Sequence, residues 1–264
     1  MAMLHTIYFS GKGTTRACAE YIGQLLDREI QTYDWLRQPC DKEQEMMEDD
    51  VLLFSMPVYG GFIPYICAGM ARHLKGNHTP AILAAVYGNR HYDYALQQMK
   101  DILTAQGFVV IAAGAFLAQH SIFPSVASGR PDERDKAVMT EFAAACRELL
   151  QGWKERRFEE IRLPGSQAYD AASFQGVPFH PDADKTCTGC GACVSVCPMR
   201  AIDAASPAKT DPAKCISCGA CIAACPAGAR GYHGAAYKAA GLIFAKKCSA
   251  YRVAELYYVK ELQV

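Results

Sequence analysis

Apolar and polar residues alternate regularly over residues 1–163. Short apolar runs at residues 4–9, 51–56, 81–87 and 108–117 are typical of strands covered on both faces, and residues 29–33 form a weaker strand candidate. Amphipathic stretches at residues 14–27, 65–74, 92–106 and 132–151 predict helices between the strands. Strands that alternate with helices predict an α/β fold, in which a parallel sheet carries helices on both faces. Five strands suit the doubly wound order 2-1-3-4-5.

This alternation stops near residue 163, and the rest of the chain divides into three parts. Residues 164–184 are rich in Pro, Gly, Ser and Ala, which predicts a linker on the surface. Residues 185–232 form a second, cysteine-rich domain. In the extension at residues 233–264, we expect Lys246–Lys247, followed by residues 259–262, to form a strand or strap packed against a domain. Within the first domain, the acidic run at residues 41–50 predicts a solvated loop before the third strand.

The composition excludes several classes of function. The 264 residues are 51% hydrophobic, which is enough for more than one buried core. Because 27 Lys and Arg balance 27 Asp and Glu, the chain lacks the cationic surplus with which proteins bind nucleic acids. The longest strongly apolar stretch, residues 109–118, is too short to span a membrane, and the first residues lack the basic region and cleavage site of a signal peptide. We therefore expect a cytoplasmic protein without a membrane or nucleic-acid partner.

Eight of the thirteen cysteines lie between Cys187 and Cys225, in two copies of one motif. The spacing Cys-x2-Cys-x2-Cys-x3-Cys-Pro begins at Cys187 and again at Cys215, 28 residues later. In the bacterial ferredoxin run with this spacing, the fourth cysteine ligates the other cluster. The spacing therefore predicts two [4Fe–4S] clusters. One is held by Cys187, Cys190, Cys193 and Cys225, and the other by Cys215, Cys218, Cys221 and Cys197.

Zinc sites and disulfides are the alternatives for so many thiols. A zinc site usually takes four ligands in pairs, which explains neither the third cysteine of each run nor the repeated Cys-Pro. Of the five remaining cysteines, Cys18, Cys67 and Cys146 lie in patterns typical of core positions. Cys40 and Cys248 have charged neighbours and no evident partner.

Three loops follow predicted strands at the sheet edge where open α/β sheets bind their ligands. They contain Ser10, Gly11, Lys12, Gly13, Thr14 and Thr15 in the first loop, Pro57, Val58, Tyr59, Gly60, Gly61 and Phe62 in the second, and Gly88, Asn89, Arg90, Tyr92 and Asp93 in the third. Backbone N–H groups of the first loop, which leads into a helix, converge on an anion. Tyr59 is a candidate for stacking on a flavin ring, and Tyr92 is a second. The alternative is that both tyrosines pack on the core.

The motifs Ser-Gly-Lys-Gly-Thr-Thr, Pro-Val-Tyr-Gly-Gly and Tyr-Gly-Asn-Arg, with the doubled cysteine run, resemble those of the flavodoxin–ferredoxin fusion proteins of anaerobes. The resemblance covers most of the chain. It implies a flavodoxin-like domain with a five-stranded parallel sheet in the order 2-1-3-4-5, joined to a small α+β domain of the bacterial ferredoxin type. It also implies one non-covalent FMN. Gln119-His120-Ser121 looks like a further family element near the flavin, and a loop histidine with structural hydrogen bonds is the alternative.

The first loop departs from the usual flavodoxin sequence, Thr/Ser-x-Thr-Gly-Asn-Thr. Lys12 replaces a hydroxyl residue and Thr14 replaces asparagine, so we expect the cofactor to be held differently. Lys12 adds Coulomb attraction to a phosphate, but an exposed lysine contributes little.

Iron–sulfur clusters transfer single electrons, whereas a flavin accepts one or two. We predict an electron-transfer protein that passes single electrons between two clusters and FMN, and on to a partner protein or a small acceptor. An FMN-dependent reductase of a small organic substrate is the alternative. An open pocket over the flavin would favour the reductase, whereas Tyr59, Phe62, Tyr92 and Phe123 would close that face. A redox sensor is the third alternative. No catalytic constellation stands out, and His91 and His120 are the candidates for protonating the flavin.

Overall fold

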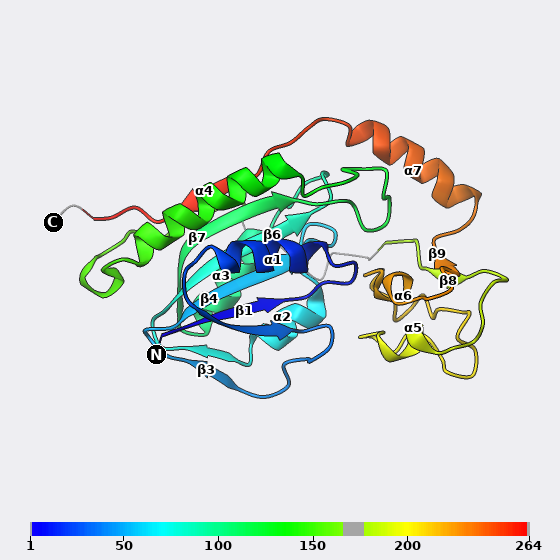
Figure 1. The fold of residues 1–264 in the computed structure, drawn as a ribbon, viewed down its shortest axis with the longest axis horizontal. Helices are drawn as coiled ribbons and strands as arrows, with labels where there is room; N and C mark the ends of the chain where they lie inside the picture. Colours follow the sequence, from blue (N-terminus) through cyan, green and yellow to red (C-terminus); the bar gives the residue numbers. More distant parts are fainter. Residues whose placement is uncertain (1, 166–176, 263–264) are drawn as a thin grey trace.

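A parallel sheet forms the centre of the first domain (Figure 1). The computed structural model describes residues 2–165 and 177–262. Within these residues the sheet has six strands, in the order β10-β7-β6-β4-β1-β2. They are β1 (Met3–Tyr8), β2 (Glu29–Asp34), β4 (Val51–Pro57), β6 (Thr79–Tyr87), β7 (Phe108–Leu117) and β10 (Glu255–Tyr258). All are parallel except β10, which pairs antiparallel with β7.

The five parallel strands follow the flavodoxin-like order 2-1-3-4-5, as the sequence predicts. The predicted five-stranded parallel sheet is confirmed, and the end of the chain adds a sixth, antiparallel strand, β10, to the free edge of β7. Glu255 lies opposite Ala115 and Leu256 opposite Gly114. A strand of four residues is too short to be recognised from alternation alone, and pairing with β7 stabilises it by covering an open sheet edge.

Helices cover both faces of the sheet (Figure 1). α1 (Thr14–Gln24) and α4 (Glu133–Leu150) pack together on one face, and α2 (Tyr65–Ala71) and α3 (Ala95–Ala105) on the other. α4 begins with a capping box, in which the Asp132 carboxylate accepts hydrogen bonds from the backbone N–H groups of Arg134 and Asp135. Strands β4 and β6 are buried along their whole length, so the core lies where the sequence places its apolar runs.

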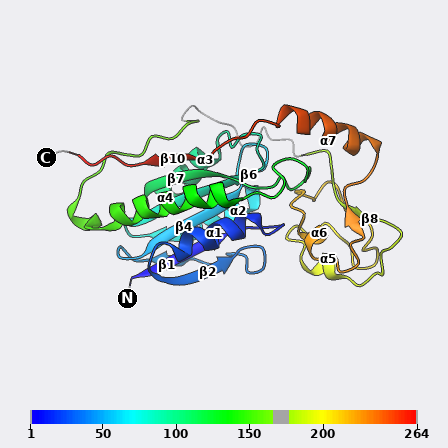
Figure 2. The same cartoon turned by 45° about the horizontal axis from the view of Figure 1, so that its top comes forward.

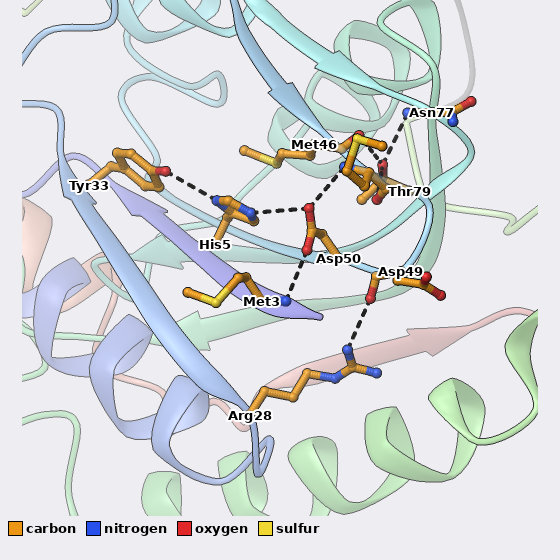
Figure 3. Close-up of polar contacts among 10 residues, drawn as sticks. Met3, His5, Arg28, Tyr33, Met46, Asp49, Asp50, Asn77 and Thr79 are labelled. Atoms are coloured by element: carbon orange, nitrogen blue, oxygen red, sulfur yellow. Dashed lines mark hydrogen bonds and ion pairs between the residues drawn. The ribbon is translucent and has the colours of Figure 1, made fainter. Parts of the chain in front are cut away.

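The acidic run at residues 41–50 is exposed along most of its length, as its charge predicts, but it is not simply a loop. It contains β3 (Gln44–Met46), which pairs with β5 (Leu74–Gly76). At the end of the run, the buried Asp50 accepts hydrogen bonds from the backbone N–H groups of Met3 and Met47, both at 2.9 Å (Figure 3). His5 Nε2 lies 3.5 Å from the same carboxylate. Asp50 directly precedes β4, so its carboxylate joins the start of β1 to the start of β4. A count of charges along the sequence does not reveal this role.

Replacing Asp50 with alanine should lower the free energy of unfolding by about 2 kcal/mol, because two partly buried hydrogen bonds lose their charged acceptor. Desolvation favours a higher pKa, but the Met3 and Met47 N–H groups, with His5, hold the pKa of Asp50 below its usual value. The carboxylate therefore stabilises the fold at neutral pH, and this contribution is lost as the pH falls through the folded-state pKa. Asp49→Ala is the matched control. Among the described residues, the exposed Asp49 carboxylate pairs with Lys154, and the hydrogen bond from Arg28 to the main-chain carbonyl of residue 49 is retained in the variant. Urea unfolding followed by circular dichroism at pH 7 compares the two variants, and equal losses would contradict this role.

The cysteine-rich domain lies beyond the carboxyl ends of the parallel strands, in both views (Figures 1 and 2). It contains two one-turn helices, α5 (Ala192–Ser195) and α6 (Ala220–Ala223). Two short strands, β8 (Asp182–Ala183) and β9 (Arg230–Gly231), pair antiparallel. This arrangement is the small α+β domain that the sequence predicts. The predicted linker at residues 164–184 falls largely on residues 166–176, which lie outside the described residues. The three boundaries between the four parts of the chain stay predictions.

The extension after residue 232 returns from the second domain to the first (Figure 2). α7 (Ala235–Lys247) packs Tyr237 and Phe244 against Phe123, and β10 follows. Near the end of the chain, Glu159 N–H donates to the Lys260 carbonyl at 2.8 Å, beyond the short helix η1 (Trp153–Glu155). The predicted residues 259–262 do pack against the first domain, since Val259 N–H donates to the Ile111 carbonyl and Leu262 N–H to the Arg157 carbonyl, but the strand lies just before them, in β10. Within residues 2–165 and 177–262, no helix is long and apolar enough to cross a membrane.

Candidate functional site

Four of the predicted cluster ligands line one cavity of the second domain. Cys187, Cys190, Cys193 and Cys225, the first quartet, surround it together with Arg230. Desolvation favours a higher pKa for Cys225, but the backbone N–H groups of residues 227–230 lower it overall. Backbone N–H groups directed at a cysteine sulfur are the donors that a cluster-bound thiolate requires. The first quartet therefore fits an iron–sulfur cluster.

The other four predicted ligands also lie together. Cys197, Cys215 and Cys221 all act electrostatically on Cys218, so this second quartet includes the last cysteine of the first run. Burial, as the main cause, raises the pKa of the Cys218 thiol to about 12. Bound iron must therefore supply the positive charge that stabilises this thiolate. Ala201 N–H donates to Cys197 Sγ and Ser217 N–H to Cys215 Sγ, both at 3.3 Å.

The repeated sequence produces a repeated local structure around the two quartets. Gly191 and Gly219 precede α5 and α6 at equivalent places, each with φ of 75°, a conformation that favours glycine. Each one-turn helix then carries the third cysteine of its run, Cys193 or Cys221. No three Cys, His, Asp or Glu side chains of the described residues are grouped closely enough to hold one metal ion. A cubane spreads its four thiolates over four iron atoms, so its ligands need not converge on one point.

The first predicted flavin loop, residues 10–15, ends at the start of α1. The N-cap residue of this helix is Gly13, which has no side chain to cap it. Gly13 has a φ of 88°, and a Cβ there would meet open space. Ser10 Oγ accepts a hydrogen bond from Arg16 N–H at 3.1 Å, which holds the loop against the helix. The N–H groups of Thr14 and Thr15 at this helix start are the donors that a phosphate takes.

The second and third predicted loops, residues 57–62 and 88–93, touch each other. Gly60 and Gly61 form a tight turn at positive φ, and Tyr59 N–H donates to the Phe62 carbonyl at 2.7 Å. Pro57 ends β4 and Val58 follows it, half-buried. A Cβ at Gly61 would lie 2.5 Å from Asp93 Oδ2. Arg90 pairs with the same carboxylate.

The third loop also contacts the segment after β7. A Cβ at Gly88 would lie 2.6 Å from His120 Cδ2. His120 Nδ1 accepts hydrogen bonds from Ile122 N–H and Phe123 N–H, both at 3.1 Å. These are the structural hydrogen bonds of a loop histidine, which was the alternative to a residue near the flavin. Burial, with the charges of Arg90 and Lys12, lowers the pKa of His120 to about 4. At neutral pH this imidazole is therefore uncharged.

Two residues of the third loop are bound by the C-terminal extension. Asn89 Nδ2 donates to the carbonyls of Cys248 and Ala250, at 2.7 and 2.9 Å. Its Oδ1 is buried, and no described group donates to it. The Tyr92 hydroxyl donates to Glu255 at 2.6 Å, and the ring is 1% exposed. Tyr92 therefore packs on the core, which was the alternative interpretation of this residue. Its contact with a flavin stays a prediction.

The first loop lies directly against the second quartet. A Cβ at Gly11 would overlap the carbonyl oxygen of Cys218, so only glycine fits there. The Lys12 side chain lies against Gly219, and its Nζ is 3.5 Å from the Ser121 carbonyl. Lys12 is half-buried, and this burial lowers its pKa, so the lysine is not fully exposed. The contact with the second domain covers part of it, and the loop sequence alone cannot show that contact.

Tyr59 joins the second loop to the same quartet. Burial, as the main cause, and the charge of Cys218 raise the pKa of Tyr59. Cys218 is 9% exposed and belongs to the apolar cluster of the first domain, in which Val58 and Tyr59 also pack. Phe62 and Phe123 are buried elsewhere, Phe62 on Tyr94 and Phe123 on Tyr237. Of the four aromatic residues expected to close the flavin face, Tyr59 is the one that these contacts place in the loop beside Cys218.

The sequence reasoning missed Arg230, which lines the cavity of the first quartet. The signal was present in the repeat, because Arg230 follows Ile202 by the same 28 residues that separate Cys215 from Cys187. The core cysteines were predicted correctly, since Cys18, Cys67 and Cys146 are buried.

Residues 186–229 match the family model described as the 4Fe-4S dicluster domain. This part of the chain is a ferredoxin-type domain. Both cysteine runs lie inside the match, so the ferredoxin-type domain binds 4Fe-4S clusters and makes this a redox protein. The sequence matches no curated protein.

The first domain is similar to solved flavodoxins. An archaeal flavodoxin is 13% identical with a TM-score of 0.38, and the match covers 57% of this chain and 99% of that one. Flavodoxin 1 from Bacillus cereus is 16% identical with a TM-score of 0.39, over 54% and 95% of the two chains. Flavodoxin of Fusobacterium nucleatum, solved with flavin mononucleotide, is 10% identical with a TM-score of 0.40, over 56% and 98%. The assignment of the flavodoxin-like fold rests on the strand order.

Proposed function

We propose that the protein is an iron–sulfur flavoprotein that transfers single electrons between two [4Fe–4S] clusters and one FMN. A redox partner protein or a small acceptor exchanges electrons with it. The observation that carries this proposal is the contact between Gly11 and Cys218, since it brings the first flavin loop against a ligand of the second quartet. A cluster and a flavin at this contact are close enough to exchange electrons directly.

The residues of the three loops supply the groups that FMN requires. The N–H groups at the start of α1 bind the phosphate, and the charge of Lys12 lies within the same loop. Asn89 Oδ1 is a buried acceptor without a donor among the described residues, and the flavin ring offers an N–H. Tyr59, a residue of the second loop, packs in the same apolar cluster as Cys218. FMN, when bound, accepts one or two electrons, whereas each cluster transfers one.

The two quartets differ in their exposure to solvent, and this difference defines a path for electrons through the protein. Cys190 of the first quartet is exposed, whereas Cys218 of the second is buried against the first domain. An external partner therefore reaches the first cluster, and the second cluster connects it to the flavin. Electrons enter or leave through the ferredoxin-type domain and are stored at the sheet edge.

Protein purified without air should contain about eight irons and one FMN per chain. On mixing with a reduced ferredoxin, the cluster absorbance should decrease first and the flavin absorbance second, because the clusters lie on the path to the flavin. Stopped-flow spectroscopy resolves the two steps. Absence of flavin, or flavin reduction ahead of the clusters, would overturn the proposal. Saturable product formation from quinones or nitro compounds would instead identify a reductase.

A further inference from the structure

Arg230 occupies a place in the repeat where the other copy has an apolar residue. The sequence Cys-Pro-Met-Arg-Ala-Ile ends the first run at Ile202, and Cys-Pro-Ala-Gly-Ala-Arg ends the second at Arg230. Ile202 packs on Cys193 and Cys221 in a small apolar cluster. Arg230 is equally buried, at 3% exposure, so a guanidinium replaces a core side chain in one half of the domain only.

The guanidinium contacts the first quartet. Arg230 Nη1 donates to Cys193 Sγ at 3.6 Å and to the Pro207 carbonyl at 2.5 Å. Nη2 donates to the Pro181 carbonyl at 2.7 Å and to Thr210 Oγ1. Arg230 also lines the cavity that this quartet surrounds. Its nitrogen atoms therefore combine structural hydrogen bonds with one bond to a predicted cluster ligand.

The charge of Arg230 has no carboxylate partner among the described residues, where every ion pair involves other side chains. A buried cation without a partner is strongly unfavourable. Thiolate ligands with their cluster carry a net negative charge, which increases when the cluster takes up an electron. The sulfur atoms around the cavity are the available counter-charge. Arg230 also acts on Cys221 of the second quartet, where its charge and a side-chain hydrogen bond oppose the increase in pKa that burial causes. The cavity that Arg230 lines is nevertheless that of the first quartet.

We propose that Arg230 raises the reduction potential of the cluster in the first quartet above that of the cluster in the second. The proposal rests on the two clusters of the proposed function. A cationic donor at Cys193 Sγ stabilises the reduced cluster more than the oxidised one, because reduction adds one negative charge. The guanidinium keeps its proton throughout, so only an electron is transferred. The solvent-facing cluster thereby holds an electron more readily than the cluster next to the flavin loops.

The test is a potentiometric titration of the whole protein with dithionite and mediators, in which electron paramagnetic resonance detects each reduced cluster. The wild type should reduce in two separate steps. Arg230→Met should lower the equilibrium constant for reducing the first cluster about tenfold, which corresponds to a shift of about 59 mV for one electron. Arg230→Lys should retain most of the wild-type value. Lys209→Met removes an exposed cation from the same domain and should change neither step by more than about twofold, because solvent screens it.

Either of two results would overturn the proposal. In the first, the equilibrium constants for reducing both clusters of Arg230→Met remain within about twofold of the wild-type values. In the second, the Met and Lys variants shift these constants by the same amount, which would assign Arg230 a purely structural role. If Arg230→Met fails to assemble its clusters, the wild-type titration decides, since a single step for both clusters contradicts the inference. The readout does not depend on FMN. A protein without flavin would refute the proposed electron route and leave the inference about Arg230 intact.

Discussion

Replacing Cys218 with alanine should remove one cluster and alter the flavin, whereas replacing Cys190 should remove the other cluster and leave the flavin unchanged. Each cluster needs four thiolates, so either variant should lose roughly half of the about eight irons per chain. Cys218 is buried beside Gly11 and in the same apolar cluster as Tyr59, so loss of its cluster changes the surroundings of the flavin ring. Cys190 is exposed in the first quartet.

Iron, sulfide and flavin analysis of anaerobic protein measures the composition, and flavin fluorescence measures the surroundings of the ring. Cys146→Ala is the matched control, because Cys146 is buried in α4 and belongs to neither quartet. It should retain both clusters and FMN, with only the moderate loss of stability expected for a smaller core side chain. If either ligand variant lost the flavin and both clusters together, the division into two domains would be wrong.

Replacing Gly11 with alanine should slow electron transfer from the clusters to the flavin by about tenfold, while both groups remain bound. The added Cβ would overlap the carbonyl oxygen of Cys218, which is backbone and cannot rotate away. Relieving an overlap of this kind typically costs ~1–3 kcal/mol, and here the cheapest relief is to separate the first loop from the second quartet. Electron transfer depends steeply on distance, so a small separation has a large effect on the rate.

Flavin reduction in single-turnover stopped-flow experiments measures this effect. Gly69→Ala in α2 is the control, because a Cβ there meets open space and alanine favours the helix. It should transfer electrons at the wild-type rate. A Gly11→Ala protein with an unchanged rate would mean that electrons reach the flavin by a path that does not cross this contact.

Local patterns predicted most of the fold because each depends on neighbouring residues. Apolar runs predicted β4, β6 and β7, whose side chains are buried by helices on both faces. The acidic run was predicted only in part, because Asp50 is buried by hydrogen bonds to Met3 and Met47, one of which is distant in the sequence. The strand or strap was predicted just after β10, since β10 becomes a strand by pairing with β7.

The sequence also predicted one part of the candidate site and missed another. Loop sequences predicted which residues gather at the sheet edge, and Gly61 meeting Asp93 agrees with that prediction. They did not reveal that Tyr92 donates to Glu255, or that Asn89 binds the carbonyl of Cys248, because the extension carries no motif. Arg230 was overlooked because only the cysteines of the repeat were compared.

The sequence by itself determined the chemistry of this protein, because the spacing of eight cysteines specifies iron–sulfur ligation whatever surrounds it. It also determined that the first domain has a parallel sheet, through apolar runs that are stable only when helices cover them. Only the tertiary structure decided that Cys218 lies against Gly11 and that Arg230 lies beside Cys193. Such contacts join surfaces whose residues are far apart in the chain, and their shape and charge match only after each domain has folded.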